Sequence, residues 1–157
     1  MSQPCRSHRG VAVRPIHTAD DAIRTLMLAT DDGSTDCVVV ACVDAARRPL
    51  TLFVFDRSPG VAQTPDPGGR ASPDDDLEQA VEALLAASAS ADSPLSAVFL
   101  GSCRPDSEPG PTPEDELRWL RLADLCADAG IELLDWFLVT DGAVCSVAEG
   151  LRPGPGW

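Results

Sequence analysis

The sequence predicts a single α/β domain with a mixed central β-sheet and flanking helices. Three segments pair a hydroxyl residue with an acid three positions later, which is the pattern that opens a helix. Five short apolar runs, rich in Val, Leu and Phe, lie between these segments and have the length of strands. The resulting order, helix, hairpin, helix, strand, loop, helix, hairpin, is typical of helices packed on a mixed sheet.

The three predicted helices share one kind of start. The pairs of hydroxyl and acid are Thr18 with Asp21, Ser72 with Asp75, and Thr112 with Asp115. Proline follows the second and third hydroxyl residues, at the first helical position, where a missing N–H costs nothing. The first helix spans residues 19–29, and the third ends at Gly130. In the third helix we expect Trp119, Leu122, Ala123 and Cys126 to face inward and Arg118, Arg121 and Asp128 to face water.

The strands are predicted at residues 37–43, 50–55, 95–101, 135–140 and 143–147. The polar turn DAARRP joins the first two strands as an antiparallel hairpin. Asp141-Gly142 joins the last two and is the strongest short hairpin signal in the chain. The domain is then expected at residues 14–150, with a flexible arm at 1–13, a mobile loop at 58–73 and a flexible tail at 151–157.

Composition excludes several classes of function. The 157 residues carry a net charge of −13, and all twelve basic residues are arginine. This acidity argues against direct binding to nucleic acid, which requires clustered cations. No apolar run approaches the ~20 residues of a membrane span, and the start MSQPCRSHRG lacks the apolar stretch of a secretory signal. We therefore expect a cytoplasmic protein with no membrane partner.

The six cysteines form no C-x-x-C pair. Cys37 and Cys42 lie five positions apart in one predicted strand, so their side chains are expected on opposite faces. Cys126 lies on the apolar stripe of the third helix. The pattern indicates buried thiols that behave as small hydrophobic side chains rather than disulfides or a zinc site.

Several collinear segments, covering nearly the whole chain, resemble the RadC-like branch of the JAB/MPN (JAMM) metallopeptidase-fold family. Residues 102–107, SCRPDS, stand where that family has H-x-H-P-S-G, and residues 111–115, PTPED, stand where it has P-S-x-x-D. Residues 130–150, GIELLDWFLVTDGAVCSVAEG, resemble its G-I-x-L-L-D-H-x-I-V segment and closing hairpin, with Trp136 in place of the usual histidine. Residues 16–26, IHTADDAIRTL, resemble the helix that precedes the first strand. The resemblance implies a JAB/MPN-like domain with cytidine-deaminase-like layering.

In such enzymes two imidazoles and the helix-opening carboxylate hold Zn²⁺, and a glutamate moves protons between the metal-bound water and the leaving group. The resemblance puts Ser102 and Arg104 at the histidine positions, and Asp36 at the glutamate position. The helix-opening hydroxyl and ligand positions keep Thr112 and Asp115. Ser102 is a poor ligand, and the guanidinium of Arg104 has no lone pair to offer. We therefore expect a degenerate site with no metal, no cofactor and no catalytic residue.

Arg104 suggests a specific arrangement of this degenerate site. Two buried carboxylates without a cation are costly, so we expect the guanidinium to replace the charge of the metal and to bridge Asp36 and Asp115. Plainer interpretations exist for both acids. Asp115 is also a helix-capping residue, and Asp36 also fits an exposed acid at the start of a strand.

The resemblance implies a catalytically inactive module that binds or scaffolds an unidentified protein partner, with a homodimer as one form. The alternative is a hydrolase of peptidase or isopeptidase type that uses an atypical metal or a Cys103 thiolate activated by Arg104. That thiolate requires a base, which would have to come from Asp36 or from His8 or His17, and both histidines precede the first predicted strand. The family's association with DNA repair suggests nucleic-acid work as a third function, against which the charge argues.

Overall fold

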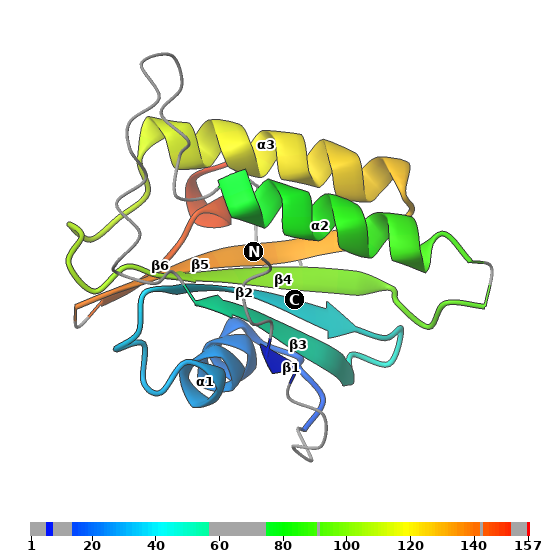
Figure 1. Cartoon of the computed structure of the whole chain (residues 1–157), viewed down its shortest axis with the longest axis horizontal. Helices are drawn as coiled ribbons and strands as arrows, with labels where there is room; N and C mark the ends of the chain where they lie inside the picture. The colour runs from blue at the N-terminus through cyan, green and yellow to red at the C-terminus, as the bar shows by residue number, and fades with distance from the viewer. Residues whose placement is uncertain (1–5, 8–13, 57–74, 91, 142, 152–156) are drawn as a thin grey trace.

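The computed structural model describes residues 6–7, 14–56, 75–90, 92–141, 143–151 and 157. These residues form a layered domain in which a sheet separates helix α1 from helices α2 and α3 (Figure 1). The predicted fold class, a mixed sheet with helices on its faces, is confirmed. None of the helices in this described part of the chain is long and apolar enough to cross a membrane.

The described strands form one sheet in the order β1-β3-β2-β4-β5-β6. Their bounds are β1 Arg6–Ser7, β2 Cys37–Val43, β3 Pro49–Asp56, β4 Ala97–Cys103, β5 Glu132–Thr140 and β6 Ala143–Ser146. Strands β4 and β5 run parallel, and every other neighbouring pair in the sheet is antiparallel. The helices are α1 Ala19–Ala29, α2 Asp75–Ser88 and α3 Pro113–Asp128, followed near the end of the chain by the short 3₁₀ helix η1, Ala148–Gly150. Because a parallel pair needs a crossover, α3 connects β4 to β5 across one face of the sheet (Figure 1).

The predicted helix starts are confirmed at α1 and α3. Thr18 and Thr112 each accept a hydrogen bond from the backbone three residues later, and the acid at that position bonds back to the cap. The predicted start at Ser72, and the loop at 58–73, lie outside the described residues. Helix α3 ends where Gly130 takes φ +71°, and the N–H of Ile131 then reaches the carbonyl oxygen of Cys126 at 2.8 Å.

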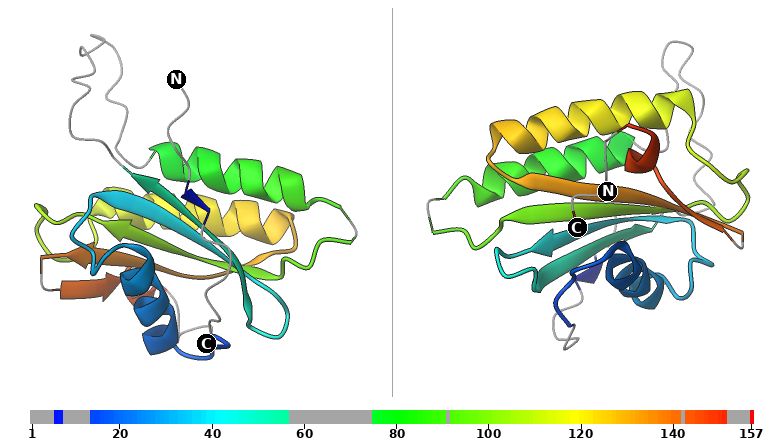
Figure 2. Two further views of the ribbon diagram at one scale, coloured as in Figure 1. Left: turned by 60° about the horizontal axis from the view of Figure 1, so that its bottom comes forward. Right: turned by 180° about the vertical axis from the view of Figure 1, so that it is seen from behind.

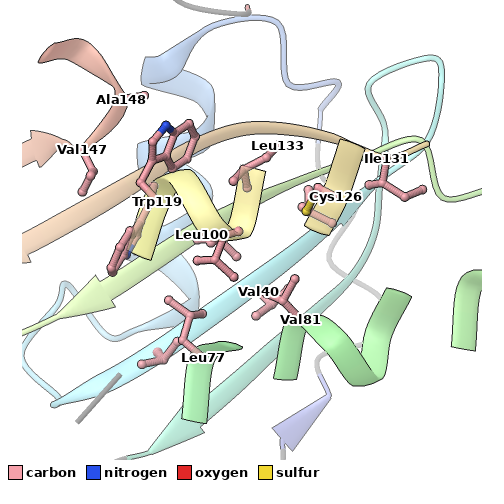
Figure 3. Packing of buried hydrophobic residues seen from close by; sticks show 14 of the residues in the cluster. Val40, Leu77, Val81, Leu100, Trp119, Cys126, Ile131, Leu133, Val147 and Ala148 are labelled. Atoms are coloured by element: carbon pink, nitrogen blue, oxygen red, sulfur yellow. The ribbon is translucent and has the colours of Figure 1, made fainter. Parts of the chain in front are cut away.

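Two hydrophobic clusters lie on opposite faces of the sheet. The cluster under α2 and α3 is shown in Figure 3, where Leu77, Val81 and Trp119 of the helices meet Val40 and Leu100 of the strands. On the opposite face the cluster is covered by α1 alone among the described helices, as the two views of Figure 2 show. It is built around these residues: Leu26, Val39, Phe99, Phe137 and Val139. Residues of β2 alternate between the two clusters, so the apolar run is buried on both faces, as expected of a central strand.

One predicted helix face is wrong. Arg118 was expected to face water, but only 2% of it is exposed. Helix α2 lies beside α3 (Figure 1), and the Arg118 guanidinium lies between Glu78 of α2 at 3.6 Å and Glu114 at 3.3 Å. Arg121 and Asp128 are exposed, as predicted. The sequence periodicity of α3 alone does not reveal that a second helix covers this flank.

The predicted boundaries of two strands are also corrected. The strand expected at 95–101 is Ala97–Cys103, so Ser102 and Cys103 belong to β4 and not to the following loop. Both residues pair with β2 on one side and β5 on the other, which extends the strand beyond the apolar run. Strand β5 begins at Glu132, three residues before the predicted start.

The ends of the domain contain two structured features. In the predicted arm at 1–13 the structure describes only Arg6–Ser7, which form β1 along β3. In the predicted tail at 151–157 it describes Leu151 and Trp157. The Trp157 ring packs against Phe99 and Phe137, at centroid distances of 6.1 and 6.2 Å, on the α1 side of the sheet.

Candidate functional site

The predicted site lies where β2 begins and β4 ends. The β2–β4 register pairs Cys37 with Cys103, so one residue further Asp36 lies opposite Arg104. The backbone N–H of Arg104 donates to the carbonyl oxygen of Val139 at 2.7 Å, which continues the β4–β5 pairing beyond the strand. This bond fixes the main chain of Arg104 at the edge of the core, so its side chain starts from a defined position.

Arg104 and Asp115 form a two-point ion pair. Nη2 of Arg104 lies 2.7 Å from Oδ1 of Asp115, and Nη1 lies 3.1 Å from Oδ2. The side chains are 14% and 5% exposed. A planar guanidinium that meets both oxygens of a carboxylate in this way gives a geometrically specific and strong hydrogen-bonded pair. The Asp115 part of the predicted bridge is therefore present.

Asp115 also caps helix α3. Its Oδ2 accepts from the backbone N–H of Thr112 at 2.9 Å and from the Thr112 hydroxyl at 2.8 Å. Burial raises the pKa of Asp115, but hydrogen bonds from Arg104 and Thr112 outweigh it and hold the pKa below the usual range. Asp115 thus serves both as the helix cap of α3 and as the partner of Arg104.

Trp136 also belongs to this group of side chains, although its type predicts only a core residue. It is fully buried, as expected of a core residue, and its Nε1 donates to Oγ of Ser102 at 3.0 Å. Its ring also lies under the guanidinium of Arg104, with Cζ 5.9 Å from the ring centroid, within the range of a cation–π contact. The available signal was its position, since Trp136 stands where the resembling family has a histidine.

Asp36 occupies a different environment from Asp115. It is exposed and directly precedes β2, at the same end of the sheet as Arg104. The structure therefore brings Ser102, Trp136, Arg104, Thr112 and Asp115 into one contact network. Asp36 lies at the same end of the sheet, with an exposed side chain.

The side chains at this site do not fit a zinc ion of the family's type. Both oxygens of Asp115 are engaged by Arg104, and the hydroxyl of Ser102 accepts from an indole N–H. A guanidinium carries no lone pair for a metal, and its positive charge repels one. Among the residues that the structure describes, no three His, Cys, Asp or Glu side chains are grouped so that they could hold a metal ion.

Cys103 lies on the other face of the sheet from the arginine pair. It is buried in the cluster on the α1 side, whereas its neighbour Ser102 contacts Trp136 on the α2 and α3 side. Of the two histidines, His17 is exposed before α1, and His8 lies outside the described residues.

Comparison with known proteins leaves the family open. A scan against protein-family models found no match, and a search of curated proteins found no significant match. The resemblance to the RadC-like branch is thus carried by the collinear motifs and by the site they specify.

Proposed function

We propose that this chain is a cytoplasmic, metal-free JAB/MPN-like domain that acts by binding a protein partner rather than by hydrolysis. The observation that carries the proposal is the Arg104–Asp115 pair. It joins two positions at which the resembling family holds zinc, and it supplies a fixed positive charge where the metal would supply one.

Three features of the site support a loss of hydrolytic function. Metal hydrolysis needs an open coordination position and a water of lowered pKa, and a guanidinium provides neither. The pair keeps Asp115 ionised and hydrogen-bonded, so the carboxylate stabilises the domain instead of holding a metal. Trp136 fills the space beside Ser102 and bonds to its hydroxyl, so the chain has packed its former ligand positions together.

Binding is the activity that such a domain retains. The net charge of −13 favours a partner with a basic or neutral surface and disfavours nucleic acid. A second copy of the chain is one allowed partner, and native mass spectrometry of the purified protein tests it. Capture with the tagged chain in its own cells, at low and at high salt, tests for a separate protein partner whose retention falls as salt screens the charges.

The inactive site is tested by elemental analysis together with a peptide and isopeptide hydrolysis assay after incubation with Zn²⁺. We expect zinc far below one ion per chain and hydrolysis at the buffer rate. One retained zinc per chain, with hydrolysis that a chelator abolishes, would overturn the proposal.

Rebuilding the site tests its placement. The double variant Ser102→His/Arg104→His restores the family's ligand types, and adding Trp136→Phe removes the indole N–H that donates to residue 102 and brings in no further ligand. We expect the triple variant to bind about one zinc per chain, because structural and catalytic zinc sites need at least three such ligands. The matched control adds Asp115→Asn and should lose that zinc. A triple variant that folds, by circular dichroism, and binds no zinc would count against the family assignment.

A further inference from the structure

Cys37 and Cys103 face each other across two antiparallel strands. They are register partners at the ends of β2 and β4, and both side chains are buried in the cluster on the α1 side. Directly paired residues of antiparallel strands have Cα atoms about 4.5 or 5.5 Å apart, depending on the kind of pair. Both separations fall within the ~4.4–6.8 Å that a disulfide spans, so the register allows a bond between these two sulfurs.

The other described cysteines have no such neighbour in the sheet. Cys42 is paired with Val98, and Cys145 with Leu138. Cys126 lies on α3, on the opposite face. Within the described part of the chain, the register therefore favours one specific disulfide.

We propose that Cys37 and Cys103 form a redox-modification site, a dithiol that a hydroperoxide converts to a cross-strand disulfide. One thiolate attacks a peroxide oxygen, the O–O bond breaks, and a sulfenic acid forms while the alcohol or water leaves. The second thiolate attacks the sulfenic sulfur, the S–O bond breaks, and water leaves. The two sulfurs lose two electrons, the hydroperoxide gains them, and the thiol protons leave on the two product oxygens.

The structure also indicates what controls the reaction. Helix α1 covers this face, with the Leu26 side chain packed so closely on Gly101 that an added Cβ there would lie 2.8 Å from it. The turn after α1 also packs closely on this face of the sheet, because Gly33 contacts Val139, the residue of β5 that is paired with Cys103. Oxidation is therefore slow and limited by local opening of α1 and this turn, whereas the disulfide, once formed, ties together the strand ends that carry Asp36 and Arg104.

The test is exposure of the full chain to hydrogen peroxide, followed by intact mass measurement and peptide mapping without reductant. We expect the loss of two hydrogen atoms, one cross-linked peptide pair that contains Cys37 and Cys103, and full reversal by dithiothreitol. Because the disulfide closes the loop between Cys37 and Cys103 and so restricts the unfolded chain, it should raise Tm by about 5–10 °C. Cys42→Ala is the control and should keep the cross-link, whereas Cys37→Ala and Cys103→Ala should each lose it.

Two results would overturn the inference, and both can be obtained with the unsubstituted chain even if a variant fails to fold. The first is that Cys37 and Cys103 remain fully alkylatable in denaturant after prolonged oxidation. The second is that the disulfides formed connect other cysteines. Neither result bears on the zinc and hydrolysis measurements, so the two proposals succeed or fail separately.

Discussion

The guanidinium of Arg104 meets both carboxylate oxygens of Asp115, at 2.7 and 3.1 Å, where β4 leaves the sheet and α3 begins. The same carboxylate closes the capping box of Thr112. One acid thus satisfies the first turn of a helix and the charge of a largely buried arginine. Since each partner offsets the burial cost of the other, removal of either one leaves a charge in a poorly solvated place.

Replacing Arg104 with Met should therefore be strongly destabilising. We expect Arg104→Met to lower the free energy of unfolding by about 3 kcal/mol at pH 7, because Asp115 remains buried without its cation. Urea denaturation followed by circular dichroism measures the change.

A second buried arginine provides the matched control. Arg118 is more buried than Arg104, with 3% of its side chain exposed against 14%. Its partners Glu78 and Glu114 are 25% and 65% exposed, and Glu78 also contacts Arg121 at 3.0 Å, so neither acid is left buried without a cation or water when Arg118 is removed. Arg118→Met should cost only about 1 kcal/mol. Equal costs for the two variants would contradict the argument that Asp115 is the poorly solvated partner.

The effect of Arg104→Met should also depend on pH. The folded pKa of Asp115 is lowered, so its contribution is fully present above the unfolded value of ~3.9 and is lost as pH falls through the folded pKa. In the variant, protonation of Asp115 removes the unpaired charge. The deficit of Arg104→Met relative to the unsubstituted chain should therefore shrink between pH 5 and pH 2. Unfolding free energies from urea titrations across this range test it, and a deficit that stays constant would show that the pair is not responsible.

The parts of the site that the sequence predicted are those fixed by neighbouring residues. The capping box of Thr112 and Asp115 needs only three positions of chain and was visible directly. The burial of Arg118 depends on a second helix lying alongside α3, which no pattern within α3 encodes. Ser102 was assigned to a loop because the apolar run ends before it, whereas pairing with β2 and β5 holds it in the sheet. Trp136 is of a residue type that is usually found in the core. Its contacts with Ser102 and Arg104 depend on the packing of β4 beside β5, which the residue type does not reveal.

Gly33 should be required for the turn that covers the α1 side of the sheet. It has φ +75°, and an added Cβ would lie 2.7 Å from Cγ1 of Val139. Gly33→Ala therefore combines backbone strain with a steric clash, and we expect a loss of about 2–4 kcal/mol in unfolding free energy. Gly130→Ala is the control, since Gly130 has φ +71° but open space around it, and should cost about 1 kcal/mol. Chemical denaturation measures the loss of unfolding free energy in both variants. Since both glycines have positive φ but only Gly33 contacts Val139, equal losses would show that this contact is unimportant.

Asp135 should show the opposite pH dependence from Asp115. It is buried in β5, where Oδ1 accepts from the Ser146 hydroxyl at 2.7 Å and from the backbone N–H of Trp136 at 2.7 Å. Burial outweighs these bonds and raises the pKa of Asp135. The folded chain therefore binds this proton more tightly than the unfolded chain, and the group adds stability as pH falls through its folded pKa towards ~3.9.

Asp135→Asn keeps an acceptor oxygen of similar shape and removes the titration. Other acids titrate equally in both proteins, so the difference in unfolding free energy between the unsubstituted chain and this variant isolates Asp135. We expect that difference to move in favour of the unsubstituted chain as pH is lowered from 7 to 4. Asp128→Asn, at an exposed position at the end of α3, is the control for the loss of one carboxylate charge. A difference that moves the other way would mean that the hydrogen bonds from Ser146 and Trp136 outweigh burial, and that Asp135 is held as a carboxylate.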